Sequence, residues 1–147
     1  GIEQLDLEDN IYIAQHCFID ASRGLIIGEG CQICQYTSIL THSSHMAIRL
    51  YGENYAGSSK KGLIEGSVSI GKFTFVGPYS TIMPNAKIGK GSLVSSYSYV
   101  KGNFPDFSII SGNPAKVVGD TRKLDKRYLD RHPELLISYE SWAHEDN

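Results

Sequence analysis

Two histidines stand close together in this sequence, His42 and His45, in the segment Thr-His-Ser-Ser-His. Histidine is the side chain whose ordinary pKa lets it take and return a proton near neutral pH. Either residue could therefore act as a general base that removes a proton from an attacking hydroxyl or amine. A His-x-x-His pair on a loop also occurs where the rings only hydrogen-bond to the backbone, so the pair alone leaves both roles open.

Two cysteines upstream, Cys31 and Cys34, imitate one half of a zinc site that His42 and His45 would complete. Only seven residues separate Cys34 from His42, where the familiar zinc finger has about twelve. We therefore expect small buried thiols here and no structural zinc. With Cys17 the cysteines are odd in number, and free thiols in a chain of this size indicate a reducing compartment.

The composition narrows the classes of partner. The chain has 147 residues, with 14 basic and 16 acidic side chains and a formal net charge of −2. Nucleic acids and anionic membranes are usually bound by a large basic surplus, so we expect neither as a partner. No run approaches the roughly 20 apolar residues that a membrane span needs. We expect one globular domain in the cytoplasm.

A repeat of six residues must position these side chains. From Ile70 onward a branched aliphatic residue returns at every sixth position. These residues are Ile70, Val76, Ile82, Ile88, Val94 and Val100. Glycine often follows the aliphatic residue, and the fifth position is small or hydroxylic. This spacing is neither helical nor a plain strand alternation. It predicts short strands joined by tight turns, three to a coil, with the aliphatic side chains on the axis.

The same series runs upstream, with a slip of two residues at Arg23-Gly24. Its members are Leu7, Ile13, Ile19, Ile27, Ile33 and Ile39. Twelve aliphatic positions at three per coil predict four coils. The series is interrupted over residues 40–67, which places both histidines in one long insertion. Loops longer than about 12–15 residues in a compact domain are usually functional or disordered.

The repeat resembles that of the hexapeptide-repeat acyltransferases, and the resemblance covers about residues 7–118. It implies an all-β fold, a left-handed parallel β-helix of about four triangular coils with a long inserted loop and a short C-terminal helical tail. We divide the chain into a β-helix domain, 1–119, with the inserted loop 40–67, and a helical tail, 120–147. In the tail we expect Asp120 to cap a helix over 121–131 and Pro133 to begin a second helix.

The resemblance also implies a reaction. In this family a catalytic histidine lies on a long loop in the middle of the β-helix, and galactoside-type members have His-x-x-His with an arginine four residues later. Arg49 stands four residues after His45. The resemblance therefore favours His45 as the base, with His42 as second choice or partner. The implied reaction is transfer of an acetyl group from acetyl-CoA to a hydroxyl or amine of a sugar or other small acceptor.

The family's acetyl-CoA contacts can be carried over residue by residue. The segment Ser-Gly-Asn-Pro-Ala-Lys, 111–116, is similar to the signature that closes the β-helix, with its basic residue near the coenzyme phosphates. Other positions match residues that hold the pantetheine arm or form the wall of the active site. The coenzyme residues implied are Phe75, Ser95, Ser96, Lys101 and Lys116. Two positions depart from the family's pattern in this groove: Pro78 lacks an amide donor, and Tyr97 replaces the usual glycine.

Residues 68–116 hold five lysines and one acidic residue, a local basic balance suited to a phosphorylated donor. Three of these lysines, Lys72, Lys87 and Lys90, occupy free positions of the hexapeptide, where we expect solvated side chains.

Relatives with this fold are trimers with active sites between subunits. A thin four-coil core with exposed aromatic residues independently favours association, so we expect a homotrimer.

Two other functions share the repeat. A γ-carbonic-anhydrase-like zinc enzyme takes three histidines from two subunits, but a third histidine at a suitable coil position is hard to find. His16 lies far upstream, and His132 and His144 lie outside the repeat. A β-solenoid that only binds or scaffolds would leave the two loop histidines and the closing Gly-Asn-Pro-Ala-Lys segment unexplained.

Overall fold

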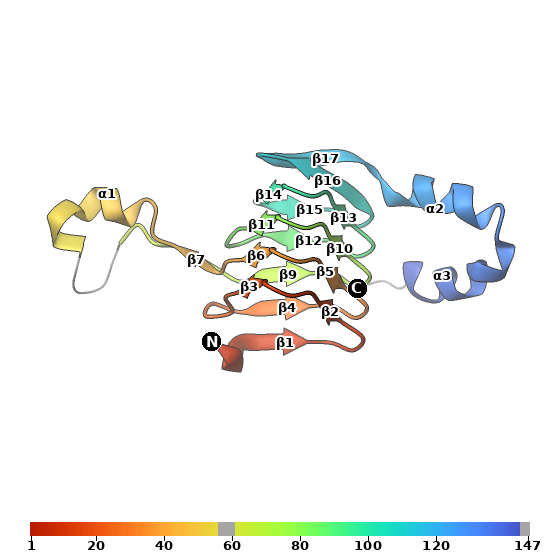
Figure 1. The fold of residues 1–147 in the computed structure, drawn as a ribbon, viewed down its shortest axis with the longest axis horizontal. Helices are drawn as coiled ribbons and strands as arrows, with labels where there is room; N and C mark the ends of the chain where they lie inside the picture. Colours follow the sequence, from red (N-terminus) through yellow and green to blue (C-terminus); the bar gives the residue numbers. More distant parts are fainter. Residues whose placement is uncertain (56–60, 145–147) are drawn as a thin grey trace.

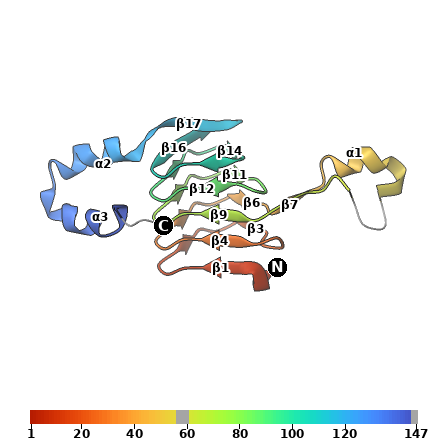
Figure 2. The ribbon, with the colours of Figure 1, turned by 180° about the vertical axis from the view of Figure 1, so that it is seen from behind.

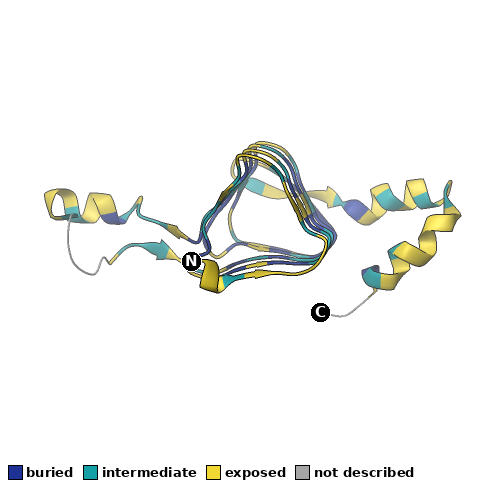
Figure 3. Cartoon of the chain, turned by 60° about the horizontal axis from the view of Figure 1, so that its bottom comes forward, coloured by how far each residue is buried: buried dark blue, intermediate teal, exposed yellow. Residues whose placement is uncertain are grey.

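The structure is a computed structural model that describes residues 1–55 and 61–144. Its body is a three-sided prism of short parallel strands (Figures 1 and 3). Sheet A contains β1 (Leu5–Leu7), β4 (Leu25–Ile27), β9 (Val68–Ile70), β12 (Lys87–Ile88) and β15 (Asn103–Phe104). Sheet B contains β2 (Tyr12–Ile13), β5 (Gln32–Ile33), β10 (Phe75–Val76), β13 (Leu93–Val94) and β16 (Ser108–Gly112), with β17 (Ala115–Asp120) antiparallel to β16. Sheet C contains β3 (Phe18–Ile19), β6 (Ser38–Ile39), β11 (Thr81–Ile82) and β14 (Tyr99–Val100).

The repeating aliphatic residues form the core of this prism. Ile33, Val76 and Val94 stack on sheet B in parallel register, and all three are fully buried. From the second coil onward the aliphatic residues of the other two sheets are buried as well, and Figure 3 draws the buried positions of the prism in dark blue. In the first coil, at the end of the prism, Leu7 and Ile13 are 45% and 38% exposed. The expected all-β architecture, a left-handed parallel β-helix, is confirmed.

The prism has about five coils, so the expected number of four was too low. The inward-facing series does not end at Val100, because Phe104 in β15 and Ile110 in β16 are also buried. The step from Val100 to Phe104 spans four residues instead of six, since the corner at 101–102 is short. A strict count of six arrives at Asp106 instead and loses the fifth coil.

Glycine follows the aliphatic residue because adjacent coils approach closely there. A Cβ on Gly77 would lie 2.7 Å from the backbone nitrogen of Ser96 in the next coil. A Cβ on Gly71 would lie 2.5 Å from the backbone nitrogen of Lys90. Both distances are shorter than any non-bonded contact of carbon, so a side chain at either position would separate the coils.

Three corners join the sheets, and two of them carry appended segments. We call them corner A/B (8–11, 28–31, 71–74, 89–92 and 105–107), corner B/C (14–17, 34–37, 77–80 and 95–98) and corner C/A (20–24, 40–67, 83–86 and 101–102). The long loop leaves corner C/A and extends away from the prism (Figures 1 and 2). It contains β7 (His42–Ser43), α1 (Ala47–Tyr51), the 3₁₀ helix Gly52–Tyr55 and β8 (Ile64–Glu65).

The C-terminal tail lies on the other side of the prism from this loop (Figure 2). It contains α2 (Thr121–Leu129), the 3₁₀ helix Pro133–Leu135 and α3 (Leu136–Ala143). As expected, Asp120 caps α2: its carboxylate accepts a hydrogen bond from the backbone nitrogen of Arg122 at 2.9 Å. None of the helices within 1–55 and 61–144 is long and apolar enough to cross a membrane.

One aromatic side chain docks the tail against corner A/B. The Trp142 ring lies between the rings of Phe73 and Phe107, with centroids 4.7 and 5.8 Å away. It occupies the space above Gly91, whose absent Cβ would lie 3.0 Å from the indole. Lys90 is only 5% exposed, and its Nζ donates to the Trp142 carbonyl at 3.5 Å. The expectation of a solvated Lys90 is therefore wrong, because the tail covers it.

Candidate active site

The base of the long loop is a two-stranded antiparallel stem at corner C/A. His42 in β7 lies opposite Glu65 in β8, and Ser43 lies opposite Ile64. Thr41, just before the stem, is fully buried. The histidine thus emerges next to a rigid coil, whereas His45 lies beyond the stem, at the entry to α1.

A carboxylate from the coil below meets the His42 ring. Asp20 directly follows β3, and its Oδ2 lies 2.7 Å from His42 Nδ1. An ionised carboxylate can only accept hydrogen bonds, so Nδ1 carries the proton and donates it to Asp20. With Nδ1 donating to Asp20, Nε2 is the ring nitrogen left to accept a proton, and the His42 side chain is 51% exposed while that of Asp20 is 11% exposed. This arrangement is that of a base oriented by a mostly buried carboxylate.

Further hydrogen bonds hold Asp20 in its ionised form. Burial of this carboxyl raises its pKa, but hydrogen bonds from Thr41 and Ser22 outweigh burial and hold the pKa of Asp20 well below its ordinary value. The Thr41 hydroxyl donates to Oδ2 at 2.7 Å and the Thr41 amide at 3.0 Å. The Ser22 amide donates to Oδ1 at 2.9 Å. Asp20 is therefore a fixed anion at neutral pH.

His45 has different surroundings. Its Nδ1 lies 2.8 Å from the Ser43 hydroxyl, and the ring is exposed. The guanidinium of Arg49 donates to the backbone carbonyl of His45, so this arginine ties together the first turn of α1. The contacts of the two rings thus distinguish two histidines that the sequence left as alternatives: His42 has a buried carboxylate partner, and His45 has a hydroxyl.

Neighbouring coils also fix the stem. Arg23 donates from Nε and from one terminal nitrogen to Glu65 Oε1, at 3.0 and 2.7 Å. The Asn85 side-chain amide, one coil above, donates to the Glu65 carbonyl at 3.0 Å. The absence of a side chain at Gly66 makes room for this contact, since a Cβ there would overlap the Asn85 amide. Residues from three coils therefore converge around His42.

The sequence analysis did not identify Asp20, Glu65 or Asn85. One signal for Asp20 was present: the two-residue slip at Arg23-Gly24 lies at the same corner as the long insertion, one coil lower. Two irregularities that share a corner mark the place where the scaffold departs from its repeat. Asp20 immediately follows the aliphatic residue before that slip.

The predicted coenzyme residues are distributed over more than one face of this chain. Lys101 is exposed at corner C/A, on the same corner as His42. Ser95 and Ser96 lie at corner B/C, across sheet C from the loop. Phe75 points outward from β10 on sheet B, 39% exposed. A single copy therefore does not bring Ser95, Ser96 and Phe75 together with His42.

Lys116 lies at the end of the prism. It belongs to β17, where it pairs with Ser111 in the hairpin that follows the last coil. A turn at 113–114 joins β16 to β17, and the Gly112 amide donates to the Ser98 hydroxyl at 3.3 Å. Lys116 is exposed above corner B/C, a position suited to an anionic group.

The three cysteines are free thiols, Cys31 buried and the other two partly exposed. Burial raises the pKa of the Cys31 thiol to about 11 and also raises that of Cys34. In the part of the chain that the structure describes, no three His, Cys, Asp or Glu side chains are grouped so that they could hold a metal ion.

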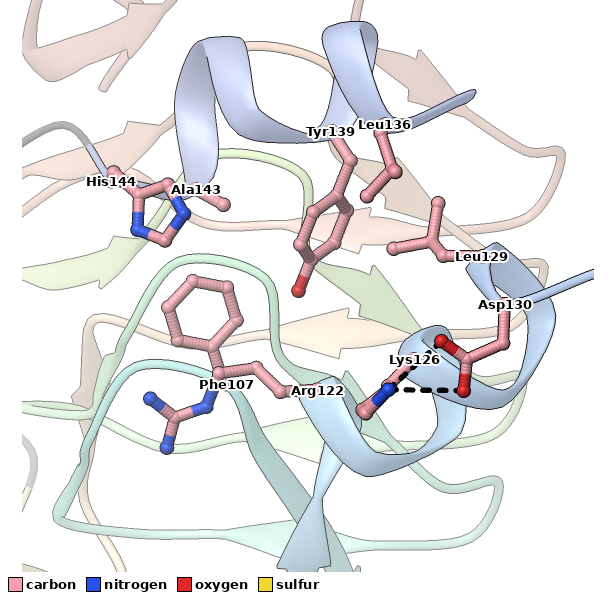
Figure 4. A pocket seen from close by; sticks show the side chains of 9 residues that line it. All are labelled: Phe107, Arg122, Lys126, Leu129, Asp130, Leu136, Tyr139, Ala143 and His144. Atoms are coloured by element: carbon pink, nitrogen blue, oxygen red, sulfur yellow. Dashed lines mark hydrogen bonds and ion pairs between the residues drawn. The ribbon is translucent and has the colours of Figure 1, made fainter. Parts of the chain in front are cut away.

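A cavity of about 390 Å³ lies between the tail and Phe107 (Figure 4). Its walls are mostly apolar residues of α2 and α3, among them Leu129, Leu136 and Tyr139. Its two cations are already paired, Lys126 with Asp130 at 2.8 Å and Arg122 with Asp120 at 2.6 Å. None of the predicted site residues lines this cavity, so we place the candidate active site at corner C/A.

Comparison with known proteins agrees with this fold. A family profile described as "Bacterial transferase hexapeptide (six repeats)" matches residues 67–102. A chloramphenicol acetyltransferase from Klebsiella aerogenes is 35% identical over 77 residues, which cover 52% of this chain and 34% of that protein. The chain thus spans about a third of the length of this relative.

Two further matches cover most of the chain. A galactoside acetyltransferase, solved in complex with coenzyme A, has a TM-score of 0.66 and 17% identity over 84% of this chain and 69% of its own, a likeness of fold. A probable macrolide acetyltransferase from Lysinibacillus sphaericus is 30% identical over 145 residues, covering 91% of this chain and 76% of that protein. With its repeat, its inserted histidine loop and this match, the chain belongs to the hexapeptide-repeat acetyltransferase family.

Proposed function

We propose that this protein transfers an acetyl group from acetyl-CoA to a hydroxyl or amine of a small acceptor, of which a sugar is the favoured class. The single observation that carries the proposal is the contact between His42 and Asp20, 2.7 Å long, at the base of the loop. It supplies an oriented, neutral imidazole in a family of acetyl transferases. The galactoside acetyltransferase with bound coenzyme A and its shared fold support the same class of donor.

His42 acts as the base in this proposal, and His45, which the arginine spacing favoured, does not. Nε2 of His42 takes the proton from the acceptor as its oxygen or nitrogen forms a bond to the thioester carbonyl carbon. The carbon–sulfur bond then breaks, and His42 returns the proton to the departing thiolate. Asp20 stabilises the imidazolium between these two steps, because it is a fixed anion bonded to Nδ1.

The predicted coenzyme residues would bind the donor, Lys101 from the same corner as His42 and the others from elsewhere on the prism. Lys101 and Lys116 are exposed cations that suit its phosphates. Ser95 and Ser96 would lie along the pantetheine arm, and Phe75 would form part of the wall. Because Pro78 has no N–H, the amide contacts at this corner must come from other positions.

We infer that the site is shared between copies in a homotrimer. His42 is at corner C/A, whereas Ser95 and Ser96 are at corner B/C on the other side of sheet C. A neighbouring copy that placed its corner B/C beside this loop would complete the site. The apolar side chains of α1, Ile48 at 47% and Leu50 at 67% exposure, are available for packing against such a neighbour.

The test measures thiol release from acetyl-CoA over a panel of sugars and amines, with bound metal assayed in the same preparation. We expect His42→Ala to lower kcat by about 10²–10⁴-fold and the matched variant His45→Ala to remain within about tenfold of wild type. A large loss in His45→Ala with an active His42→Ala would return the role to His45. Stoichiometric zinc without coenzyme binding would favour the carbonic-anhydrase-like alternative.

A further inference from the structure

Four aromatic rings form a continuous stack along corner B/C, one from each of its four turns in successive coils. His16, Tyr36, Tyr79 and Tyr97 follow one another with centroids 5.1, 4.9 and 5.0 Å apart. The angles between successive ring planes are 11°, 9° and 2°. The coils of a parallel β-helix repeat at about the spacing of hydrogen-bonded strands, which is also close to the spacing of stacked rings.

The backbone holds the four rings in the same direction. Each residue has a positive φ, between 59° and 61°, a left-handed conformation that is unfavourable for side chains other than glycine. The same unfavourable conformation recurs in each coil, so all four side chains leave the corner at the same angle. Tyr97 is the residue for which the family resemblance led us to expect a glycine.

The column ends in an open ring face. Tyr36 and Tyr79 have a ring on both sides and are each 47% exposed, through their edges. Tyr97 stacks on Tyr79 through one face only and is 69% exposed. In the next coil the chain turns back into the β16–β17 hairpin at this corner, and the hairpin supplies no fifth aromatic residue to the column.

The surroundings of this open face are polar and basic. Ser95 and Ser96 directly precede Tyr97 in the corner, and the Ser95 amide donates to the carbonyl of Ile110 in the last coil. Lys116 pairs with Ser111, the residue after Ile110, and β17 lies beyond β16 in sheet B, so this exposed cation lies two strands beyond Ser95, towards the end of the prism. Asp106, the one acidic residue of segment 68–116, is at corner A/B, where it accepts from the Lys90 amide.

We propose that the outer face of Tyr97 is a stacking platform for the adenine of the acyl donor, with Lys116 beside the adjoining phosphates. This inference rests on the function proposed above, since it assigns a subsite of the same donor. A column whose last two planes differ by 2° is extended best by another planar aromatic ring. In a nucleotide, the base can stack on the Tyr97 ring while the phosphate lies near the Lys116 cation.

Binding to fragments of the donor tests the platform. Calorimetry would measure the affinity of three ligands, coenzyme A, adenosine 3′,5′-bisphosphate and 4′-phosphopantetheine. Each ligand would be titrated into wild type, Tyr97→Ala and Tyr97→Phe. We expect Tyr97→Ala to bind the two adenine ligands about ten- to a hundredfold more weakly, as stacked bases do when the aromatic partner is removed. Binding of 4′-phosphopantetheine should not change, and Tyr97→Phe should match wild type for all three ligands.

The matched control is Tyr128→Ala, which removes an exposed tyrosine of the tail that stacks on His132. It should leave all three affinities unchanged. The proposal would be overturned if Tyr97→Ala weakened the binding of 4′-phosphopantetheine as much as the binding of the adenine ligands. Such a result would indicate damage to the whole corner. A change in oligomeric mass would overturn it as well, since the ring would then be a contact between copies.

A measurement with dTDP distinguishes the adenine of the donor from a nucleobase carried by the acceptor. If Tyr97→Ala weakens dTDP but not the adenine ligands, the platform belongs to a nucleotide-linked acceptor and the assignment to the donor is wrong. Adenine ligands that bind to wild type and Tyr97→Ala alike would overturn the platform alone and leave the acetyl transfer standing. If wild type binds none of the adenine ligands, the platform and the proposed function fail together.

Discussion

The Asp20 carboxylate accepts four hydrogen bonds, from the amide and hydroxyl of Thr41, from the Ser22 amide and from the His42 ring. Such a group does two things at once. It fixes which nitrogen of His42 carries the proton, and it ties the stem of the long loop to the coil beneath it. Catalysis and local stability therefore depend on the same side chain.

Replacement of Asp20 by asparagine should separate charge from shape. Asp20→Asn keeps the size of the side chain but removes the anion that stabilises the His42 imidazolium, so we expect kcat to fall about 10²–10⁴-fold. The KM for the acceptor should change little, because Asp20 lies behind the ring. Steady-state kinetics would check this split, and a variant that lost affinity and kept kcat would contradict it.

The same carboxylate predicts how stability depends on pH. The pKa of Asp20 is lower in the folded state than the ordinary value of about 4 in the unfolded chain. Its stabilisation is therefore complete above the unfolded pKa and disappears as the pH falls towards the folded pKa. We expect wild type to exceed Asp20→Asn by about 1–3 kcal/mol in urea unfolding from pH 5 to 7. The difference should shrink below pH 4; a constant difference down to pH 3 would contradict the assignment.

At the scale of single residues, the sequence indicated part of the candidate site. His42 could be proposed because the insertion and the paired histidines are local features. The slip at Arg23-Gly24 marks the same corner, but Asp20 itself could not be paired with His42, because it is 22 residues away in sequence and only the stacking of one coil on another brings it to the ring. A period of six predicts which residues point inward, but it does not predict which outward side chains of neighbouring coils meet.

The individual strands have only two to five residues in the parallel sheets, so each is stabilised by the coil above and below it. Their spacing then limits which residues can stand at the corners. At Gly71 and Gly77, the position after the aliphatic residue, the backbone of the next coil passes 2.5–2.7 Å from the point that a Cβ would occupy. This close approach is the physical reason for the glycine in the repeat.

A single methyl group at this position should be costly. Gly77→Ala directs its Cβ at the backbone of Ser96, which cannot move without displacing a coil, and we expect a loss of about 1–3 kcal/mol in the free energy of unfolding. Gly119→Ala is the control, because its Cβ would meet only the flexible end of Ile109 at 3.0 Å. Equal stability of the two variants in denaturant melts would show that close approach is not the constraint.

Trp142 is the aromatic contact that holds α3 against corner A/B, whereas the first residue of α2, Thr121, is hydrogen-bonded to Gly91 and Phe107. Trp142→Ala should release α3 and loosen α2 beyond Thr121 while the prism remains folded, because the aliphatic core does not include the tail. We expect trypsin to cleave α2 at least about tenfold faster, equivalent to about 1.4 kcal/mol of lost docking free energy. The prism should keep its main thermal transition. Trp142→Phe retains an aromatic ring and should stay close to wild type.

Elements were predicted well where the repeat was regular and poorly where it changed length. The helix that begins after Asp120 could be predicted from its cap. The fifth coil could not, since the short corner at 101–102 shifts Phe104 out of phase. The buried Lys90 was missed because its cover, Trp142, comes from 52 residues further along the chain.

On the scale of the whole molecule, the chain is a slender prism with an arm on each side, and its candidate catalytic and donor-binding corners are different corners (Figure 1). A closed oligomer is the simplest way to bring such surfaces together, because every copy then offers one corner to the next. The proposed trimer therefore makes a prediction that no single-copy site makes.

Two inactive variants should restore activity when their subunits are mixed. His42→Ala removes the base at corner C/A, and Ser96→Trp blocks the donor at corner B/C. In a random mixture of the two, about a quarter of the shared sites would have both corners intact, because each site takes one corner from each of two neighbours. Co-expression of both chains followed by the thiol-release assay would measure this recovery.

The control uses two defects on the same corner. Mixing His42→Ala with Asp20→Asn leaves every site with one of the two lesions, since both residues come from one copy. That mixture should show no recovery beyond the residual activity of Asp20→Asn. Recovery in neither mixture would place the whole site within one chain, and equal recovery in both would mean that the gain does not come from shared corners. Only the mixture of His42→Ala with Ser96→Trp should regain activity if His42 of one copy acts on a donor that the next copy binds.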